Sequence, residues 1–497
     1  MWNMPGNLVL TVNNGFKVLE MYMWLLDSYV LDYFTDCHWN KLPHSWRTAL
    51  DNVDPQELGK FLTHNNTFRS HQRVWPLSLL ALQVASLHLS VPREQTHFKD
   101  LLNAKGQWSG ETDSRSNALK QPSSIAHYLS SNRKSSQVEW QNAERMPCLK
   151  HPKLHYVFTK HVKPKKQHEI SRMAQMTANV AQTESCQYIV DVGSGLGHLA
   201  RLLAYGYGLK VCCLEAQENL SCEAWKLDME LETSVSKILK DSQNAKFHRP
   251  VHLNITVDTH LTAGNFTQAV KKALGISEES FDFGIVGLHS CGDLTPILMH
   301  LFVQCPGAKF INIVGCCYMK LTTGIVSGSG GYPVSEFFSA RSHSLSYEAL
   351  EIACHAIDTY RERLCLGQYE ELKVHCYRAV LEKILVKYWP HLRHTAIRSI
   401  KHSNNMTFTE YVTLAFIKLG LKVPLEDLES EETLLNLSQW KQVVVFYTLR
   451  LLLAPLVETI VLLDRLLYLQ ELGICSDLIP LFDPSLSPRN NILIAWK

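Results

Sequence analysis

The sequence predicts an α/β fold: a Rossmann-like, doubly wound sheet with an N-terminal helical region and a helical insertion before the last helix and hairpin. One observation behind this prediction is the apolar run Tyr188–Val190, which enters a glycine-rich loop and then an apolar helical pattern from Leu199 onward. A buried parallel strand that turns tightly into a helix has this layout. The other observation is a series of further short apolar runs, as a doubly wound sheet requires.

The glycine-rich loop is the most informative segment for function. It contains Asp191, Gly193, Ser194, Gly195 and Gly197. Glycines let the backbone approach a ligand, and the start of the following helix presents N–H groups to it. The Asp191 carboxylate would repel a pyrophosphate, but it suits the cationic methionine end of S-adenosyl-L-methionine. This cofactor is therefore favoured over a nicotinamide or a flavin, which stay open as alternatives.

Two more acidic residues follow the next predicted strands. The apolar run Leu209–Leu214 leads into Glu215, whose carboxylate can accept hydrogen bonds from both hydroxyls of a ribose. A third strand over Val251–Val257 ends at Asp258, from which a carboxylate could contact an adenine amino group. Together with the glycine loop, these residues form a candidate cofactor site typical of a class I methyltransferase.

The fourth and fifth predicted strands, Phe281–Leu288 and Lys309–Val314, lead into a second group of reactive side chains. The loops after them carry His289, Cys291, Cys316 and Cys317. Because ligands bind beyond the carboxyl ends of strands in such sheets, and because these two strands are expected to be neighbours, the two loops should converge near the cofactor.

This thiol and imidazole group has three interpretations. Thiolates and imidazoles are preferred ligands of zinc and other soft metals. Alternatively, Cys291 or Cys317 could be a nucleophile that adds to a base. In the third interpretation, which we favour, the cysteines pack the pocket wall; the C-x-x-C spacing of zinc knuckles is absent, and no metal is expected. His289 is a candidate general base or a structural imidazole. Together with the two possible nucleophiles, the catalytic candidates are His289, Cys291 and Cys317.

The domain organisation follows from composition and periodicity. Residues 106–146 are rich in serine, asparagine and charge, which predicts a flexible linker or insertion. The long helical pattern Val443–Leu469 precedes two apolar runs, Asp477–Phe482 and Asn491–Trp496, which predict a final helix and an antiparallel hairpin. The expected divisions are a helical region at 1–105, the linker, a cofactor-binding core at 150–335, a helical insertion at 336–440, and a helix with hairpin at 441–497.

Charge and cysteine content suit an intracellular protein. The net charge is +2, so no global basic field indicates nucleic acid, and no DNA partner is expected. The 14 cysteines, some inside predicted buried strands, resemble reduced thiols rather than a disulfide framework. The start of the sequence lacks the charged and apolar regions of a signal peptide. A cytoplasmic or nuclear location is therefore expected, and the composition leaves the oligomeric state open.

The segment 443–463 is long and apolar enough to raise the question of a membrane span. Arg450 and Glu458 interrupt it, and each would cost a few kcal/mol inside a bilayer. A helix buried by protein on several sides explains the same apolarity. The buried helix is favoured, and a membrane-associated protein is the alternative.

Several stretches of the chain resemble the methyltransferase-like 25 family. They are Pro164–Glu169, DVGSGLGHL at 191–199, GLHSCGDL at 287–294, VGCCYMKL at 314–321, the segment 451–473, and LSPRN at 486–490. The resemblance covers residues 160 to 497. It implies an S-adenosylmethionine-dependent methyltransferase, RNA as its suspected substrate, and Glu169 facing the methionine end of the cofactor.

One departure bears on the substrate. Adenine-N6 methyltransferases carry an Asn/Asp-Pro-Pro/Leu-aromatic loop after the fourth strand, whose ring stacks on the flipped base. Here the loop runs from Leu288 to Cys291 and has neither proline nor aromatic residue. The missing ring could come from Tyr318 or Tyr332, but adenine dimethylation is disfavoured.

A dense basic patch lies ahead of the first strand and consists of Lys160, Lys163, Lys165 and Lys166. It could contact RNA phosphates near the mouth of the cofactor site, although a solvated start of a helix is the simpler interpretation. Three functions remain: a methyltransferase of RNA, a methyltransferase of a protein or small molecule, and a cofactor-binding scaffold without turnover.

Overall fold

The computed structural model describes two compact units of the chain. The first contains Met1–Leu8, Pro92–Ser344 and Val461–Lys497, and the second contains Val9–Val91 and Leu345–Ile460. The linker or insertion expected at 106–146 lies outside the described residues. Those are 6–62, 73–96, 156, 158–238, 248–324, 331–341, 343–395, 397, 400, 405–422 and 424–497.

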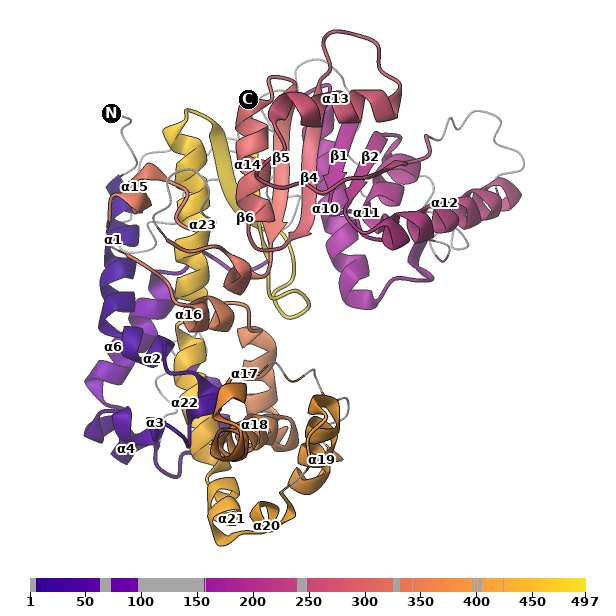
Figure 1. The fold of residues 1–497 in the computed structure, drawn as a ribbon. Helices are drawn as coiled ribbons and strands as arrows, with labels where there is room; N and C mark the ends of the chain where they lie inside the picture. The colour runs from indigo at the N-terminus through magenta and orange to yellow at the C-terminus, as the bar shows by residue number, and fades with distance from the viewer. Residues whose placement is uncertain are drawn as a thin grey trace. The chain divides into compact units, whose positions relative to one another are not determined.

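The first unit is built on a seven-stranded sheet with the order β3-β2-β1-β4-β5-β7-β6 (Figure 1). Its strands are β1 Tyr188–Val192, β2 Lys210–Glu215, β3 Val251–Asn254, β4 Phe283–Ser290, β5 Ala308–Gly315, β6 Cys475–Pro480 and β7 Asn491–Trp496. Strands β1 to β5 pair in parallel, and β7 runs antiparallel to both of its neighbours, β5 and β6. The predicted fold class is confirmed. The chain changes direction across the sheet between β1 and β4, where ligands bind in folds of this kind.

Helices cover both faces of this sheet. One apolar cluster joins α10 (Pro164–Thr183), α11 (His198–Arg201) and α12 (Glu218–Ile238) to one face. Helices α13 (Ala263–Leu274) and α14 (Leu294–Gln304) contact strands of the sheet but contribute nothing to that cluster, so they cover the other face. Burial on both faces explains why the central strands read as continuous apolar runs in the sequence.

The second unit is helical. It joins the N-terminal helices α1 (Gly6–Met21) to α6 (Leu77–His88) with the helices that follow residue 345. The remaining members are α2 Met23–Leu26, α3 His38–Lys41, α4 His44–Leu50, α5 Pro55–Phe61, α16 Tyr347–Ile352, α17 Ile357–Cys365, α18 Tyr369–Tyr388, α19 Phe408–Leu419, α20 Leu425–Leu428, α21 Glu431–Ser438 and α22 Trp440–Leu452. At the centre of the unit, α22 is buried from Val443 onward, which explains its apolar sequence.

The long helix predicted over Val443–Leu469 is instead two helices, α22 and α23 (Ala454–Glu471). Pro455 explains the break, because proline lacks a backbone N–H and its ring clashes with the carbonyl four residues earlier. Among the described residues, Trp440–Glu471 is the one segment long and apolar enough to cross a membrane. Its most apolar window is fully buried by protein.

Sequence patterns placed some strand ends incorrectly. Strand β3 ends at Asn254 rather than at Val257, and β4 extends to Ser290 rather than to Leu288. Pairing of β3 with β2 stops at Glu215, so the apolar residues that follow Asn254 have no neighbouring strand to continue against.

Candidate active site

The glycine loop is held against the end of β2. The N–H groups of Gly193 and Ser194 both donate to the carbonyl of Leu214, at 2.9 and 3.3 Å. Gly193, Gly195 and Gly197 have φ values of +70°, +54° and +70°. L-residues with a side chain rarely adopt this region, so the sequence needs glycine to make the turn into α11.

Glu215, at the end of β2, joins the same loop. Its Oε2 accepts a hydrogen bond from the N–H of Gly195 at 2.8 Å, and its Oε1 accepts one from the N–H of Gln217 at 3.0 Å. The carboxylate is buried and lies directly beside the glycines, where the sequence places the ribose of a nucleoside. The structure thus brings together Glu215 and the loop residues, as the motif predicted.

Asp191 is a buried carboxylate without a complete set of partners. It is 2% exposed, and its Oδ2 has no hydrogen-bond partner. Burial raises the pKa of this carboxyl to about 7; the Lys166 ammonium opposes the shift, and the charge of Glu215 adds to it. A buried anionic oxygen is costly unless a cation or donor pairs with it. A ligand with a cationic amine fits this position, so these residues suit S-adenosyl-L-methionine.

A buried ion-pair network supports the loop, and sequence analysis missed it. Arg201 donates to the carbonyl of Leu196 in the loop at 2.6 Å and to Asp228 Oδ1 on α12 at 2.8 Å. The other oxygen of Asp228 lies 2.6 Å from His252 Nε2 on β3. A lone arginine in the apolar pattern after the glycines was the one signal in the sequence that could have indicated this network.

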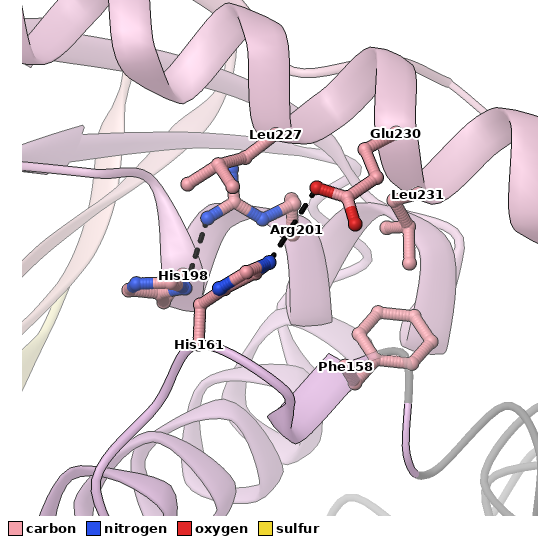
Figure 2. A pocket seen from close by; sticks show the side chains of 7 residues that line it. All are labelled: Phe158, His161, His198, Arg201, Leu227, Glu230 and Leu231. Atoms are coloured by element: carbon pink, nitrogen blue, oxygen red, sulfur yellow. Dashed lines mark hydrogen bonds and ion pairs between the residues drawn. The ribbon is translucent and has the colours of Figure 1, made fainter.

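Figure 2 shows Arg201 beside His198 in a pocket next to this network. Burial lowers the pKa of the His198 ring to about 3, and Arg201 adds to the shift. The neutral ring therefore accepts a hydrogen bond from Arg201 Nη2 at 2.9 Å. Across the same pocket, Nε2 of His161 lies 3.5 Å from Oε2 of Glu230.

The loops after β4 and β5 converge as predicted. The Sγ atom of Cys291 lies 3.0 Å from that of Cys316 and 3.4 Å from that of Cys317, and the latter two are 3.5 Å apart. His289 has a φ of +68°, and the pairing register of β4 with β5 shifts between Leu288 and Ser290. Such an irregularity turns side chains away from their regular direction.

His289 does not join the thiols through its Nε2 atom. That atom lies 2.9 Å from Oε2 of Glu169, on α10, and Oε1 of Glu169 accepts a 2.6 Å hydrogen bond from the Ser487 hydroxyl. Burial alone would raise the pKa of the Glu169 carboxyl, but His289, Ser487 and Lys165 hold that pKa below its ordinary value. The charged carboxylate of Glu169 thus holds the imidazole of His289 in place, although the two residues are more than 100 positions apart in the chain.

Other sequence-predicted residues lie as follows. Asp258 is beyond the end of β3, in a turn where its Oδ1 accepts from the N–H of His260 at 2.9 Å. Tyr318 and Tyr332 are 2% and 1% exposed, so neither ring offers a face to a flipped base. The suggestion that these rings replace the missing aromatic residue is wrong.

The four lysines of the basic patch lie at and just before the start of α10, and all four are exposed. Lys160 forms a 2.7 Å ion pair with Glu230, and Lys165 lies 3.8 Å from Glu169. The patch is therefore next to the candidate site, because the charges of Lys165 and Lys166 act on the buried carboxyls of Glu169 and Asp191, respectively.

Comparisons with known proteins agree with this geometry. A family model described as a methyltransferase domain matches residues 165–324. The chain is 32% identical over 248 residues to "Probable methyltransferase-like protein 25" of Mus musculus, a match that covers 47% of this chain and 40% of the mouse protein. With the Homo sapiens protein of the same name it is 29% identical over 275 residues, which cover 52% of this chain and 42% of the relative.

A solved structure, that of the plantazolicin methyltransferase BpumL in complex with SAH, aligns with 56% of this chain and 88% of its own chain. The identity is 15% and the TM-score is 0.21, which is too low to support any conclusion about this chain. The matches to the curated relatives span less than half of their length. The chain carries a methyltransferase domain, which implies S-adenosyl-L-methionine as cofactor, and it is related to methyltransferase-like protein 25, as its motifs predicted.

Proposed function

We propose that this protein transfers a methyl group from S-adenosyl-L-methionine to RNA. The observation that carries the first half of this proposal is the buried, unpartnered oxygen of Asp191 beside the glycine loop and Glu215. When bound, the cofactor supplies a sulfonium methyl group that is already electrophilic. The protein therefore needs mainly to orient the cofactor and the acceptor and to receive a proton.

The residues of the site divide this work between them. Glu215 would accept hydrogen bonds from the ribose hydroxyls of the bound cofactor, and Asp191 would pair with the amine of its methionine end. His289 lies at the end of β4, where its ring is fixed by Glu169, and it takes the proton that an N–H or O–H acceptor loses. Water is excluded on the Asp191 side, because that carboxylate is almost completely buried.

The basic patch supports RNA as the substrate class. Lys163 and Lys166 are exposed and form no ion pair with any described residue. Their charges lie next to the candidate site and attract phosphate groups without reading a base sequence. The near-neutral charge of the whole chain limits this attraction to the patch.

The test uses the full chain and methyl-labelled S-adenosyl-L-methionine. Calorimetric titration first establishes whether the cofactor binds. Labelled cofactor is then incubated with the protein and a cell extract, and the label is counted in RNA, protein and small-molecule fractions. We expect the label in RNA, and Lys163→Glu should reduce it several-fold while Lys226→Glu, an exposed lysine on α12, should not.

Each other result contradicts part of the proposal. Label in the protein or small-molecule fraction would overturn RNA as the substrate, whereas the proposal that the protein is a methyltransferase would still stand. A folded protein that does not bind the cofactor would overturn the enzyme and favour the scaffold.

A further inference from the structure

We propose that Cys291, Cys316 and Cys317 bind one zinc ion through three thiolates, with the fourth coordination position left to a ligand that the protein does not supply. The three Sγ atoms lie within 3.0 to 3.5 Å of one another. This goes beyond methyl transfer and does not depend on it. It also departs from the sequence-based expectation, which favoured pocket packing and no metal.

The backbone around the cluster is built to hold the thiols together. Ser290 pairs with Gly315 across neighbouring parallel strands, so the residues that follow each of them emerge side by side. Gly292 has a φ of +53°, and a Cβ atom there would lie 2.7 Å from the carbonyl oxygen of Lys320. The two loops thus pack so closely that only glycine fits, and the thiols are held near one another by the fold.

Packing alone does not account for these cysteines. Cysteines that serve as small apolar side chains are among the most buried residues. Cys212 and Cys213 in β2 are 0% and 1% exposed. By contrast, Cys291 is exposed, and Cys316 and Cys317 are only half-buried. Three partly exposed thiols that meet from two separate loops are therefore better suited to binding a ligand than to filling a core.

The cluster fits the coordination chemistry of zinc. With Zn–S bonds of about 2.3 Å, a tetrahedral site separates its sulfur atoms by about 3.8 Å. To reach that separation, the sulfur atoms need to move apart by about 0.3 to 0.8 Å, with the largest shift between Cys291 and Cys316. Soft thiolates select zinc over magnesium or calcium, and each thiol that becomes a ligand releases its proton to solvent.

The neighbouring residues that could complete the coordination are already engaged. The two oxygens of Asp293 accept hydrogen bonds from the N–H and the hydroxyl of Thr322, at 2.8 and 2.5 Å. His289 directs its Nε2 to Glu169. Among the described residues, no fourth His, Cys, Asp or Glu joins the three cysteines. Sites with three protein ligands are the catalytic type, in which water or substrate fills the fourth position.

Zinc content of the full chain tests this proposal. The chain is purified under reducing conditions and dialysed against metal-free buffer, and its zinc is measured by mass spectrometry. We expect about one zinc ion per chain. Occupancy should fall about tenfold or more in Cys291→Ser and remain unchanged in Cys222→Ser, which removes an exposed cysteine on α12. Equal circular dichroism spectra of the two variants at room temperature would show that both are folded and that the loss is local, while Cys291→Ser should melt at a lower temperature because it lacks the bound metal.

X-ray absorption and intact mass provide two independent checks of the site. Absorption at the zinc edge of the unmodified chain should give about three sulfur neighbours at about 2.3 Å, a result that needs no variant to fold. Metal-free protein, zinc that survives Cys291→Ser, or a coordination shell poor in sulfur would overturn the proposal. An intact mass lower by two hydrogens, with the disulfide mapped by peptide digestion to two of these three cysteines, would also overturn it.

Discussion

The two ends of the candidate site are built differently. At the carboxyl ends of β1 and β2, the glycine loop is held by backbone hydrogen bonds and by acids that lie within about one βαβ unit of sequence. At the ends of β4 and β5, the contacts join distant segments of the chain: Glu169 holds His289, and the Ser487 hydroxyl donates to Glu169. The first half, the glycine loop with its acids, can therefore be predicted from local sequence. The second half, His289 with its contacts, depends on tertiary structure.

The largest expected effect concerns the buried ion-pair network of Arg201, which supports the glycine loop in the first half of the site. Arg201→Met should reduce the free energy of unfolding by about 3–5 kcal/mol, because it leaves the buried charge of Asp228 with only His252 as a partner. Thermal and denaturant unfolding measure this loss. Lys226→Met breaks an exposed 3.4 Å ion pair with Glu223 and should cost about 0–1 kcal/mol. Equal losses in the two variants would show that the buried network does not stabilise the loop.

The next effect belongs to the second half of the site. His289→Ala should lower kcat about 10²–10³-fold, because the acceptor loses the group that takes its proton, while the Kd for the cofactor stays the same. Glu169→Gln, which removes the charge that fixes the ring, should lower kcat by less. Methyl-transfer rates and calorimetry give the two quantities, with His260→Ala, an exposed histidine, as control. A weaker affinity for the cofactor with an unchanged kcat would show that His289 contributes to cofactor binding rather than to proton transfer.

A smaller effect is expected at the ribose end. Glu215→Ala removes a charged acceptor, and each such hydrogen bond contributes about 1.5–3 kcal/mol, so the Kd for the cofactor should rise about 10- to 100-fold. Glu218→Ala changes an exposed glutamate on α12, three residues further along, and should leave the Kd unchanged. If both variants bind the cofactor like the unmodified chain, the ribose is not held by the end of β2.

The same difference between the halves decides what the sequence could predict. Strand β1, the glycines and Glu215 follow from a local pattern, so the fold and this part of the site were predictable. The contact between Ser487 and Glu169 joins segments more than 300 residues apart and was not. The break before Pro455 was missed for a different reason, because apolar periodicity outweighed a single proline.

Local sequence patterns also could not predict which helices belong to the same compact unit. The N-terminal helices and those after residue 345 read as two separate helical regions, yet they form one compact body. Helix α5 packs against α17, for example. Pairing of distant helices depends on which apolar faces match, and periodicity in one segment carries no information about its partner.

A further expected effect is a pH dependence that originates at Asp191. Its carboxyl has a pKa of about 7 in the fold, above the ordinary value of 3.8. Between those values the unfolded chain loses a proton that the folded chain keeps, so the contribution of Asp191 to stability falls as pH rises through this window. Above about pH 7 the buried charge is present in full, and Asp191→Asn should raise the melting temperature there. Near about pH 4 the two proteins should melt alike.

Cofactor binding should show the opposite sign, because the amine of the cofactor pairs with the ionised form of Asp191. The affinity of the unmodified chain should rise about tenfold from about pH 5.5 to about pH 7, a range in which an α-amine stays mostly protonated. Asp191→Asn should bind more weakly and with little dependence on pH. Calorimetry at several pH values measures both. A pH-independent affinity in the unmodified chain would mean that the Asp191 carboxylate does not contact the ligand, and the binding half would then rest on Glu215 and the backbone of the glycine loop.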